Sequence, residues 1–373
     1  MRSRFLLALL LLSATCMAKD LYLFIGTYTG TGSKGIYVYR FNTETGKATW
    51  VSNTDSLVNP SFLCPTSNGK FLYAVSESGG NFPGKINAFA FDKKSGILKF
   101  INAQSSGGDN PCYVSVTKNG KWVAVANYTG GNLSVFNTND NGSLNKASQM
   151  MQDIGTGPNK GRQEKPHVHS VVFSPDDKQL FAPDLGTDKV MIYTFKSSSA
   201  MPLEPADPAF AETLPGRGPR HFTFHPNKKY AYLIQELAGE INGYVYKKGK
   251  LTNIQNIATH PEGFKGQPGS ADIHPSPDGK FLYASNRGEE NNIAIFSIDP
   301  TNGLLEPKGY QSTLGIKPRN FCIDPTGNFL LVANQDSGNI VIFKRDKETG
   351  LLSPTGDEIK IPKPVCLMFT PGK

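Results

Sequence analysis

The apolar residues of this chain recur in short alternating runs, and a polar turn separates each pair of runs. Alternation over about four to eight residues predicts a β-strand with one face toward a core, and the turn joins two strands into a hairpin. Long amphipathic helical patterns are absent from the sequence, so an all-β chain is predicted. Six hairpins align without gaps: "FLCPTSNGKFLYAVSE" (62–77), "YVSVTKNGKWVAVANY" (113–128), "SVVFSPDDKQLFAPDL" (170–185), "HFTFHPNKKYAYLIQE" (221–236), "DIHPSPDGKFLYASNR" (272–287) and "NFCIDPTGNFLLVANQ" (320–335).

The hairpins belong to a longer repeat, because their starts lie 51, 57, 51, 51 and 48 residues apart. Each hairpin is followed by a third apolar run, such as "KVMIYTF" or "NIAIFSI", and then by a turn and a weaker fourth run. Four antiparallel strands repeated at about 40–50 residues are typical of a β-propeller blade. A single blade cannot bury both of its faces, so the repeat predicts one cooperative domain over residues 19–373.

The two ends of the chain supply a seventh blade. Residues 21–41 contain "LYLFIGTYT" and "GIYVYRF", which we interpret as second and third strands without a first. Residues 363–372, "KPVCLMFTPG", have the pattern of a first strand without the others. Pairing the two ends would close the ring and protect the sheet edges. The sequence therefore predicts a seven-bladed β-propeller with four antiparallel strands per blade, closed by its N- and C-terminal strands.

The constant register places equivalent residues of all blades at one mouth of the central channel, where the first strand begins and the second ends. The residues before the hairpins are Ser61, Cys112, His169, Arg220, Ala271 and Arg319, with Val365 in the closing blade. The last residues of the hairpins are Glu77, Tyr128, Leu185, Glu236, Arg287 and Gln335, with Tyr28 as the N-terminal counterpart. Two rings of side chains are therefore expected around one mouth.

One imidazole, two guanidinium groups and one carboxylate converge on neighbouring blades of this mouth. Arg220 and Glu236 begin and end one hairpin, His169 lies one blade before it, and Arg287 one blade after it. We expect these four residues to be catalytic. The substrate-binding residues around them are expected to be Arg319, Glu77, Tyr128, Gln335 and His221. A buried Arg–Glu pair can also be purely structural, and this alternative stays open. Asp272 is expected to hold a neighbouring arginine.

Residues 1–18 have the pattern of a secretory signal peptide. Arg2 and Arg4 precede an apolar run over residues 5–12, and small residues near Ala18 offer a cleavage site. The run is too short to span a membrane, so we expect no stable membrane insertion. The protein is expected to be exported, either periplasmic or secreted. Cys16 leaves a lipoprotein as an alternative, although its neighbours make a poor acylation site.

Charge and cysteine content narrow the expected partners. The formal charge is +8, or +6 once residues 1–18 with their two arginines are removed. The lysines are scattered over turns without interleaved aromatic residues, so no nucleic-acid partner is expected. A mild positive field favours an anionic small molecule. Four cysteines remain after residue 18, and none forms a CxxC or Cys/His cluster, so no zinc site is predicted. We expect buried free thiols, with a disulfide as the open alternative. These cysteines are Cys64, Cys112, Cys322 and Cys366.

The expected cluster fits metal-free acid–base chemistry without a cofactor. One histidine and one carboxylate among cations are too few for a hydrolytic metal site. Serine chemistry is not favoured, because Ser61 lies two or more blades from His169. Arginines suit a carboxylate, a phosphate or a developing oxyanion. Nearby cations keep Glu236 ionised while burial raises its pKa, so it fits a general base, and His169 fits a proton donor near neutral pH. Which of the two is acid and which is base stays open.

Four stretches of the chain carry a resemblance to a known family. The chain resembles the lactonase-type seven-bladed β-propellers, which include propeller-type 6-phosphogluconolactonases and carboxymuconate cyclases. The resemblance spans nearly the whole chain after residue 18. It implies the same propeller fold and an active set of one His, two Arg and one Glu, matched by motif to His169, Arg220, Arg287 and Glu236. The stretches are "HVHSVVFSPDDKQLFAPDLGTDKV" (167–190), "GPRHFTFHPNKKYAYLIQEL" (218–237), "ADIHPSPDGKFLYASNR" (271–287) and "KPRNFCIDPTGNFLLVANQ" (317–335).

The resemblance implies hydrolysis of 6-phospho-D-glucono-1,5-lactone to 6-phosphogluconate, and hence a small anionic sugar lactone as partner. The export signal departs from this picture, because that lactone is made in the cytosol. An unphosphorylated lactone therefore stays open as the substrate. Two other functions are kept: an isomerase that forms or opens a muconate-type lactone, and an exported propeller that binds a ligand or protein without turnover. A monomer is favoured, because a closed ring needs no partner for stability.

Overall fold

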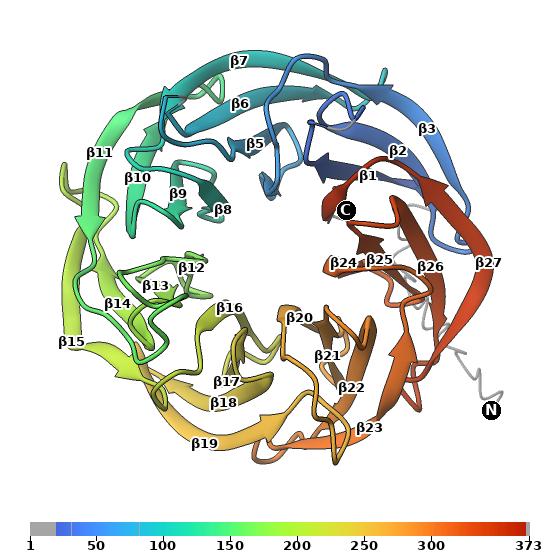
Figure 1. Cartoon of the computed structure of the whole chain (residues 1–373). Coiled ribbons are helices and arrows are strands. Elements are labelled where there is room, and N and C mark those ends of the chain that lie inside the picture. Colours follow the sequence, from blue (N-terminus) through green and yellow to red (C-terminus); the bar gives the residue numbers. More distant parts are fainter. Residues whose placement is uncertain (1–19, 31, 82, 371–373) are drawn as a thin grey trace, which may run out of the picture.

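The protein is a ring of seven β-sheets arranged around a central axis (Figure 1). The computed structural model describes residues 20–30, 32–81 and 83–370. Over these residues every regular element is a strand, and the 28 strands form seven four-stranded sheets in which neighbouring strands run antiparallel. The prediction of an all-β, seven-bladed propeller is confirmed.

The four strands of each blade lie side by side from the axis of the ring to its rim. From innermost to outermost, the blade that joins the two ends of the chain consists of β28 (Pro364–Phe369), β1 (Asp20–Thr27), β2 (Tyr37–Asn42) and β3 (Ala48–Asn53). The next three blades, in the same order, are β4 (Leu63–Pro65), β5 (Phe71–Ser76), β6 (Lys85–Asp92) and β7 (Ile97–Ser105); β8 (Pro111–Val116), β9 (Trp122–Asn127), β10 (Asn132–Thr138) and β11 (Leu144–Gln152); and β12 (Val172–Phe173), β13 (Gln179–Asp184), β14 (Lys189–Phe195) and β15 (Leu203–Glu212). The last three are β16 (Pro219–Phe224), β17 (Tyr230–Gln235), β18 (Glu240–Lys247) and β19 (Lys250–Ala258); β20 (Ser270–Pro275), β21 (Phe281–Asn286), β22 (Asn292–Ile298) and β23 (Leu305–Ser312); and β24 (Pro318–Ile323), β25 (Phe329–Asn334), β26 (Asn339–Arg345) and β27 (Leu352–Lys360).

A tight turn of constant length joins the two inner strands in six blades and fixes their register. In the blade of β16, the amide of Lys228 donates to the carbonyl of His225 at 2.9 Å, and the amide of His225 donates to the carbonyl of Tyr230 at 2.9 Å. One turn residue has a left-handed backbone in every case, a conformation that favours glycine. These residues, with φ from 54° to 73°, are Gly69, Gly120, Asp177, Lys228, Gly279 and Gly327. Equivalent residues of different blades therefore reach the same height in the ring.

The ring is closed by pairing between β28 and β1, as predicted. Leu23 lies opposite Phe369, and Ile25 lies opposite Leu367. The closing blade then packs against the next blade, where Gly26 is so close to its neighbour that a Cβ atom would lie 2.3 Å from the carbonyl oxygen of Pro60. The closure is thus a packed interface as well as a strand pair.

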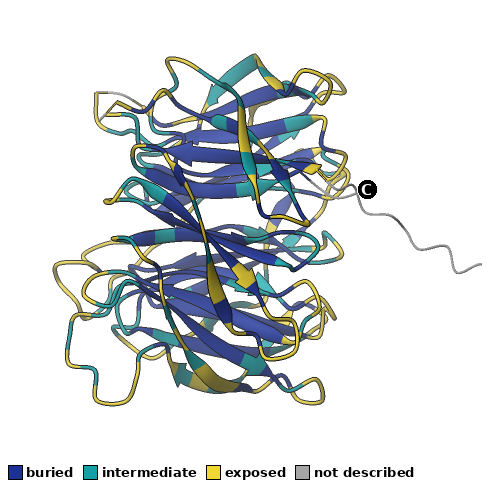
Figure 2. Ribbon diagram, turned by 90° about the vertical axis from the view of Figure 1, so that its right-hand side faces the viewer, coloured by how far each residue is buried: buried dark blue, intermediate teal, exposed yellow. Residues whose placement is uncertain are grey.

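Repeated contacts join neighbouring blades, and the inner strands of the blades are largely buried, whereas the outermost strands are partly exposed (Figure 2). The hydroxyl of Tyr73 on β5 donates to the carbonyl of Gly142 at 3.0 Å, beyond the third strand of the following blade. Tyr232 and Gly303 repeat this contact at 2.9 Å. Phe181 and Phe222 stack between two other blades with ring centres 5.3 Å apart. Such shared packing makes the blades one core.

Candidate active site

A β-bulge at the start of the inner strands explains how the ring residues reach the axis. Pro219 pairs with Gln235 and His221 pairs with Ile234, which leaves Arg220 as an extra residue. The register shifts in the same way around Cys112 on β8 and around Arg319 on β24. A bulge bends the strand and re-aims a side chain. Residues from five blades then line one narrow cavity, among them Ser61, Cys112, Arg220, Arg319 and Val365.

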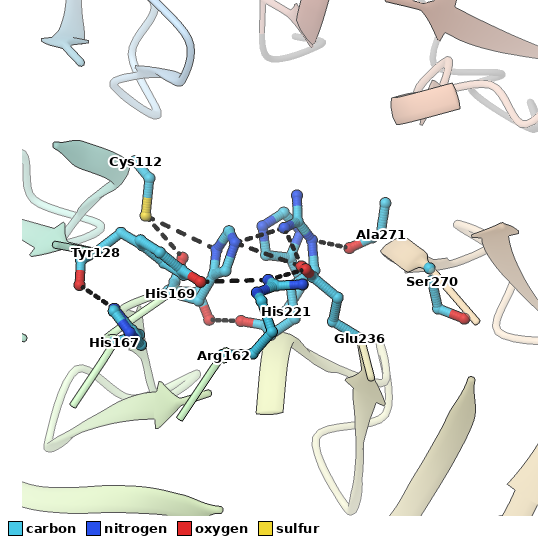
Figure 3. A network of polar contacts seen from close by, with 12 residues as sticks. Cys112, Tyr128, Arg162, His167, His169, His221, Glu236, Ser270 and Ala271 are labelled. Carbon is cyan, nitrogen blue, oxygen red and sulfur yellow. Dashed lines mark hydrogen bonds and ion pairs between the residues drawn. The ribbon is translucent and has the colours of Figure 1, made fainter. Parts of the chain in front are cut away.

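The carboxylate of Glu236 lies at the centre of a cluster of guanidinium groups (Figure 3). Its Oε2 atom is 2.6 Å from Nη1 of Arg220 and 3.1 Å from Nη2 of Arg287. Both arginines are oriented by backbone carbonyls, because Nε of Arg220 donates to Ala271 at 2.8 Å and Nε of Arg287 donates to Gly269 at 2.9 Å. The two arginines and the glutamate that the register predicted are therefore in contact.

A third guanidinium group, that of Arg162, completes the cluster from a different direction (Figure 3). Its Nη2 donates to Oε1 of Glu236 at 2.6 Å and to the hydroxyl of Tyr128 at 3.3 Å. Arg162 lies on the loop between β11 and β12, outside the aligned hairpins, so register reasoning missed it. The sequence does contain a signal for this loop, because the starts of the second and third hairpins are 57 residues apart instead of 51.

The imidazole of His169 faces the same carboxylate. Its Nε2 atom lies 3.8 Å from Oε2 of Glu236 and accepts a hydrogen bond from Nη1 of Arg220. A guanidinium group has no acceptor, so Nε2 is unprotonated and the ring proton is on Nδ1. Burial, reinforced by the charge of Arg220, holds the pKa of His169 well below its usual value. The ring is therefore neutral near pH 7, which favours the base over the acid among the two roles that the sequence left open.

Glu236 stays ionised in this setting. Burial acts to raise the pKa of Glu236, but the charges of Arg287 and Arg220 outweigh it and hold that pKa well below the usual value. Both of its oxygens accept hydrogen bonds from guanidinium groups, Oε1 from Arg162 and Oε2 from Arg220. Its charge balances the cations around it, and it lies close enough to His169 to stabilise an imidazolium.

A second group of ring residues lies around Arg319. The hydroxyl of Tyr28 donates to both carboxylate oxygens of Glu77 at 3.0 Å, and the guanidinium carbon of Arg319 lies 5.5 Å from the centre of the Tyr28 ring. The predicted residues Glu77 and Arg319 therefore meet through Tyr28 and not through Glu236. The Nε2 atom of Gln335 donates to the carboxylate of the next residue, Asp336, at 3.2 Å.

Tyr128 forms one wall of the cluster. Its ring stacks on His167 with centres 4.4 Å apart and meets the ring of His169 edge-on at 5.1 Å. Together with the hydrogen bond to Arg162, these contacts place Tyr128 between His169 and the guanidinium group that binds Glu236.

Comparisons with known proteins agree with this architecture. The family model described as "Lactonase, 7-bladed beta-propeller" matches residues 22–369. The chain belongs to the seven-bladed β-propeller lactonase family.

Named relatives extend this assignment. A 6-phosphogluconolactonase of Formosa agariphila is 46% identical over 347 residues, which cover 91% of this chain and 96% of that protein. A 6-phosphogluconolactonase of Bacillus subtilis is 38% identical over 348 residues, covering 93% and 97%. The solved structure of a periplasmic gluconolactonase of Pseudomonas aeruginosa has a TM-score of 0.89 at 36% identity, covering 94% of this chain and 99% of that chain.

In this lactonase-family propeller, His221 lies one layer deeper than the cluster. Its ring meets that of His169 edge-on at 5.4 Å, and its Nδ1 donates to Oδ1 of Asp272 at 2.7 Å. Burial lowers the pKa of His221 to about 4. The other oxygen of Asp272 contacts His274 at 2.9 Å and the amide of Asn320. The expectation that Asp272 holds an arginine is therefore wrong, since the partners of its carboxylate are two histidines, the side-chain amide of Asn320 and the backbone amide of Phe321.

The remaining predictions concern the cysteines, metal binding and the signal peptide. Cys64, Cys112, Cys322 and Cys366 are free, so the disulfide alternative is not supported. Within residues 20–370, apart from the two undescribed positions, no three His, Cys, Asp or Glu side chains gather in a way that would hold a metal ion. No helix of the described part is long and apolar enough to cross a bilayer. The predicted signal peptide and Cys16 lie outside the described residues.

Proposed function

We propose that this lactonase-family propeller hydrolyses a sugar lactone, 6-phospho-D-glucono-1,5-lactone, to 6-phosphogluconate. The observation that carries the proposal is the pairing of a neutral His169 with an ionised Glu236, 3.8 Å apart and beside two largely buried guanidinium groups. Relatives that are 46% and 38% identical bear the name 6-phosphogluconolactonase, which supports the same reaction.

The cluster supplies what water needs to attack a lactone carbonyl, namely a base and positive charge for the oxyanion. Nε2 of His169 takes a proton from water once water replaces Arg220 as its hydrogen-bond donor. The new C–O bond forms while the carbonyl electrons move to oxygen, and Arg220 with Arg287 stabilises that oxyanion. Collapse of the intermediate breaks the ring C–O bond, and the proton on His169 passes to the departing alkoxide. The product is the open-chain hydroxy acid.

Glu236 acts in this scheme as a fixed negative charge. It stabilises the imidazolium that forms on His169 and keeps Arg220 and Arg287 aimed at the carbonyl oxygen. Because its own pKa is held low by those cations, it remains ionised throughout the cycle. The alternative of a purely structural ion pair predicts that Glu236 is dispensable for turnover when the fold is kept.

Export of the protein is part of the proposal. It rests on the signal-peptide pattern of residues 1–18 and on a relative, 36% identical, that is named a periplasmic gluconolactonase. Outside the cytosol the phosphorylated lactone would not be the abundant form. The pattern therefore favours unphosphorylated glucono-1,5-lactone as the second candidate substrate of the same site.

A panel of substrates tests the proposal. Purified protein is given 6-phospho-D-glucono-1,5-lactone, D-glucono-1,5-lactone and a muconolactone, and acid release is followed in a pH-stat with the spontaneous rate subtracted. We expect catalysed acid release from at least one gluconolactone. Turnover of the muconolactone alone would assign the site to an isomerase, and binding without acid release from any of the three would overturn the hydrolase.

A further inference from the structure

Arg162 differs from the other guanidinium groups of the cluster in exposure and origin. Its side chain is 44% exposed, whereas those of Arg220 and Arg287 are 2% and 13% exposed. Arg220 and Arg287 come from the inner hairpins, and Arg162 comes from the loop that follows β11. The most exposed of the three guanidinium groups is thus the one that binds Oε1 of Glu236 (Figure 3).

The backbone beneath Arg162 is anchored, so the side chain can move without the loop. The amides of Arg162 and Gln163 both donate to the carbonyl of Asn159, at 3.0 and 2.7 Å. The side chain of Gln163 is fully buried, and its Nε2 donates to the carbonyl of Leu185 at 2.9 Å. The side chain of Arg162 extends from this fixed turn to Tyr128 and Glu236.

The negative charge of Glu236 is balanced even without its contact to Arg162. Oε2 of Glu236 already has two cationic partners, Arg220 and Arg287, which remain in place if Arg162 leaves. The three guanidinium groups carry more positive charge than one carboxylate neutralises, and a neutral His169 adds none. An entering anion would meet Arg162 first and would correct this excess.

We infer that Arg162 is a specificity-determining residue. Its guanidinium group leaves Glu236 and binds a second anionic group of the substrate. This group is a phosphate ester or a carboxylate remote from the lactone carbonyl. The planar fork of a guanidinium group suits both anions. The inference rests on the proposed function for the identity of the site. It adds that discrimination between charged and neutral lactones is located on the loop after β11, not in the ring.

Binding of reaction products tests this without turnover. Calorimetry compares D-gluconate, 6-phosphogluconate and D-glucarate, which differ at C6 by a hydroxymethyl group, a phosphate ester and a carboxylate. The intact protein should bind 6-phosphogluconate, D-glucarate or both about 10- to 100-fold more tightly than D-gluconate. The product that binds more tightly shows whether the site prefers a phosphate ester or a carboxylate. Arg162→Gln should remove that difference, and Arg162→Lys should restore part of it.

Lys160→Gln is the matched control, because Lys160 is an exposed cation on the same turn. It should leave the ratio within about twofold, as expected for an exposed charge. In kinetics, Arg162→Gln should raise KM for the charged lactone more than KM for D-glucono-1,5-lactone, so the ratio of the two kcat/KM values should fall. An unchanged binding ratio in Arg162→Gln would overturn the inference. Absence of turnover in the intact protein, with the binding ratio still dependent on Arg162, would instead overturn the proposed hydrolysis.

Discussion

Arg220 and Glu236 lie at the two ends of one hairpin, sixteen residues apart, and Nη1 of the arginine is 2.6 Å from Oε2 of the glutamate. Arg220 is also the residue that donates to Nε2 of His169. One buried guanidinium group therefore links the carboxylate of its own blade to the imidazole of the preceding blade. This link adds to burial in lowering the pKa of His169, and it adds to the charge of Arg287 in lowering the pKa of Glu236.

The first prediction concerns the pH dependence of kcat/KM. His169 must be neutral to act as a base, and burial with nearby cations keeps its pKa well below 6.5, so activity should persist as pH falls through 6.5 and decline only below it. The charges that face this ring are Arg220, Glu236 and Arg319, with a neutral His221. Arg319→Gln removes one repelling cation, so the pKa of His169 should rise.

The measurement is kcat/KM from pH 4.5 to 8 for the intact protein, Arg319→Gln and the control Arg40→Gln, whose arginine is exposed on β2. The acid limb should move to higher pH in Arg319→Gln alone. An acid limb that is identical in all three proteins would show that His169 is not the titrating base.

The second prediction concerns stability against pH. His221 has a pKa of about 4 in the fold and about 6.5 in the unfolded chain, so between these values the unfolded state binds the additional proton. The free energy of unfolding should therefore fall as pH decreases from about 6.5 to 4, and His221 should contribute about 1 kcal/mol per pH unit. The depressed pKa of His169 acts in the same direction, and the raised pKa of His274 acts against both.

Urea unfolding of the intact protein and of His221→Gln isolates this contribution, because His169 and His274 are present in both. The slope of unfolding free energy between pH 6.5 and 5 should be shallower in the variant. Equal slopes would mean that His221 is protonated in the fold.

The third prediction concerns closure of the ring. Gly26→Ala places a Cβ atom 2.3 Å from the carbonyl oxygen of Pro60, so the closing blade must shift, which should cost about 1–3 kcal/mol. Gly243→Ala is the control, because a Cβ atom on this strand glycine would meet no atom closer than 3.7 Å. Urea unfolding should show a clear loss for the first variant and none for the second. An equal effect of the two substitutions would contradict tight packing at the closure.

Much of this arrangement could be predicted from the sequence, because the turn between the inner strands has constant length. Lys228 and Asp177 stand where four other blades have glycine. The hairpins therefore align position by position, which places Arg220, Glu236, His169 and Arg287 at one mouth. The β-bulge that re-aims Arg220 leaves the count of residues in the hairpin unchanged, and so it did not disturb the alignment.

Other parts of the site depend on what a repeat cannot encode. Arg162 lies in an insertion with no counterpart in other blades, so the repeat does not predict its position along the axis of the ring. Gln335 occupies a ring position, and a repeat does not reveal that its Nε2 donates to the adjacent Asp336. The neutrality of His169 follows from its burial beside Arg220, which the sequence does not reveal.

The role of Glu236 is tested most directly by acid release from 6-phospho-D-glucono-1,5-lactone, and from D-glucono-1,5-lactone, by the intact protein and by Glu236→Gln. Circular dichroism shows that the variant is folded, and Lys160→Gln serves as a surface control. The intact protein and the control should release acid at equal rates, while Glu236→Gln should lose about 100-fold or more in kcat/KM because the imidazolium on His169 is no longer stabilised. A folded Glu236→Gln protein with full activity would contradict the account and reduce the Arg220–Glu236 pair to a structural contact.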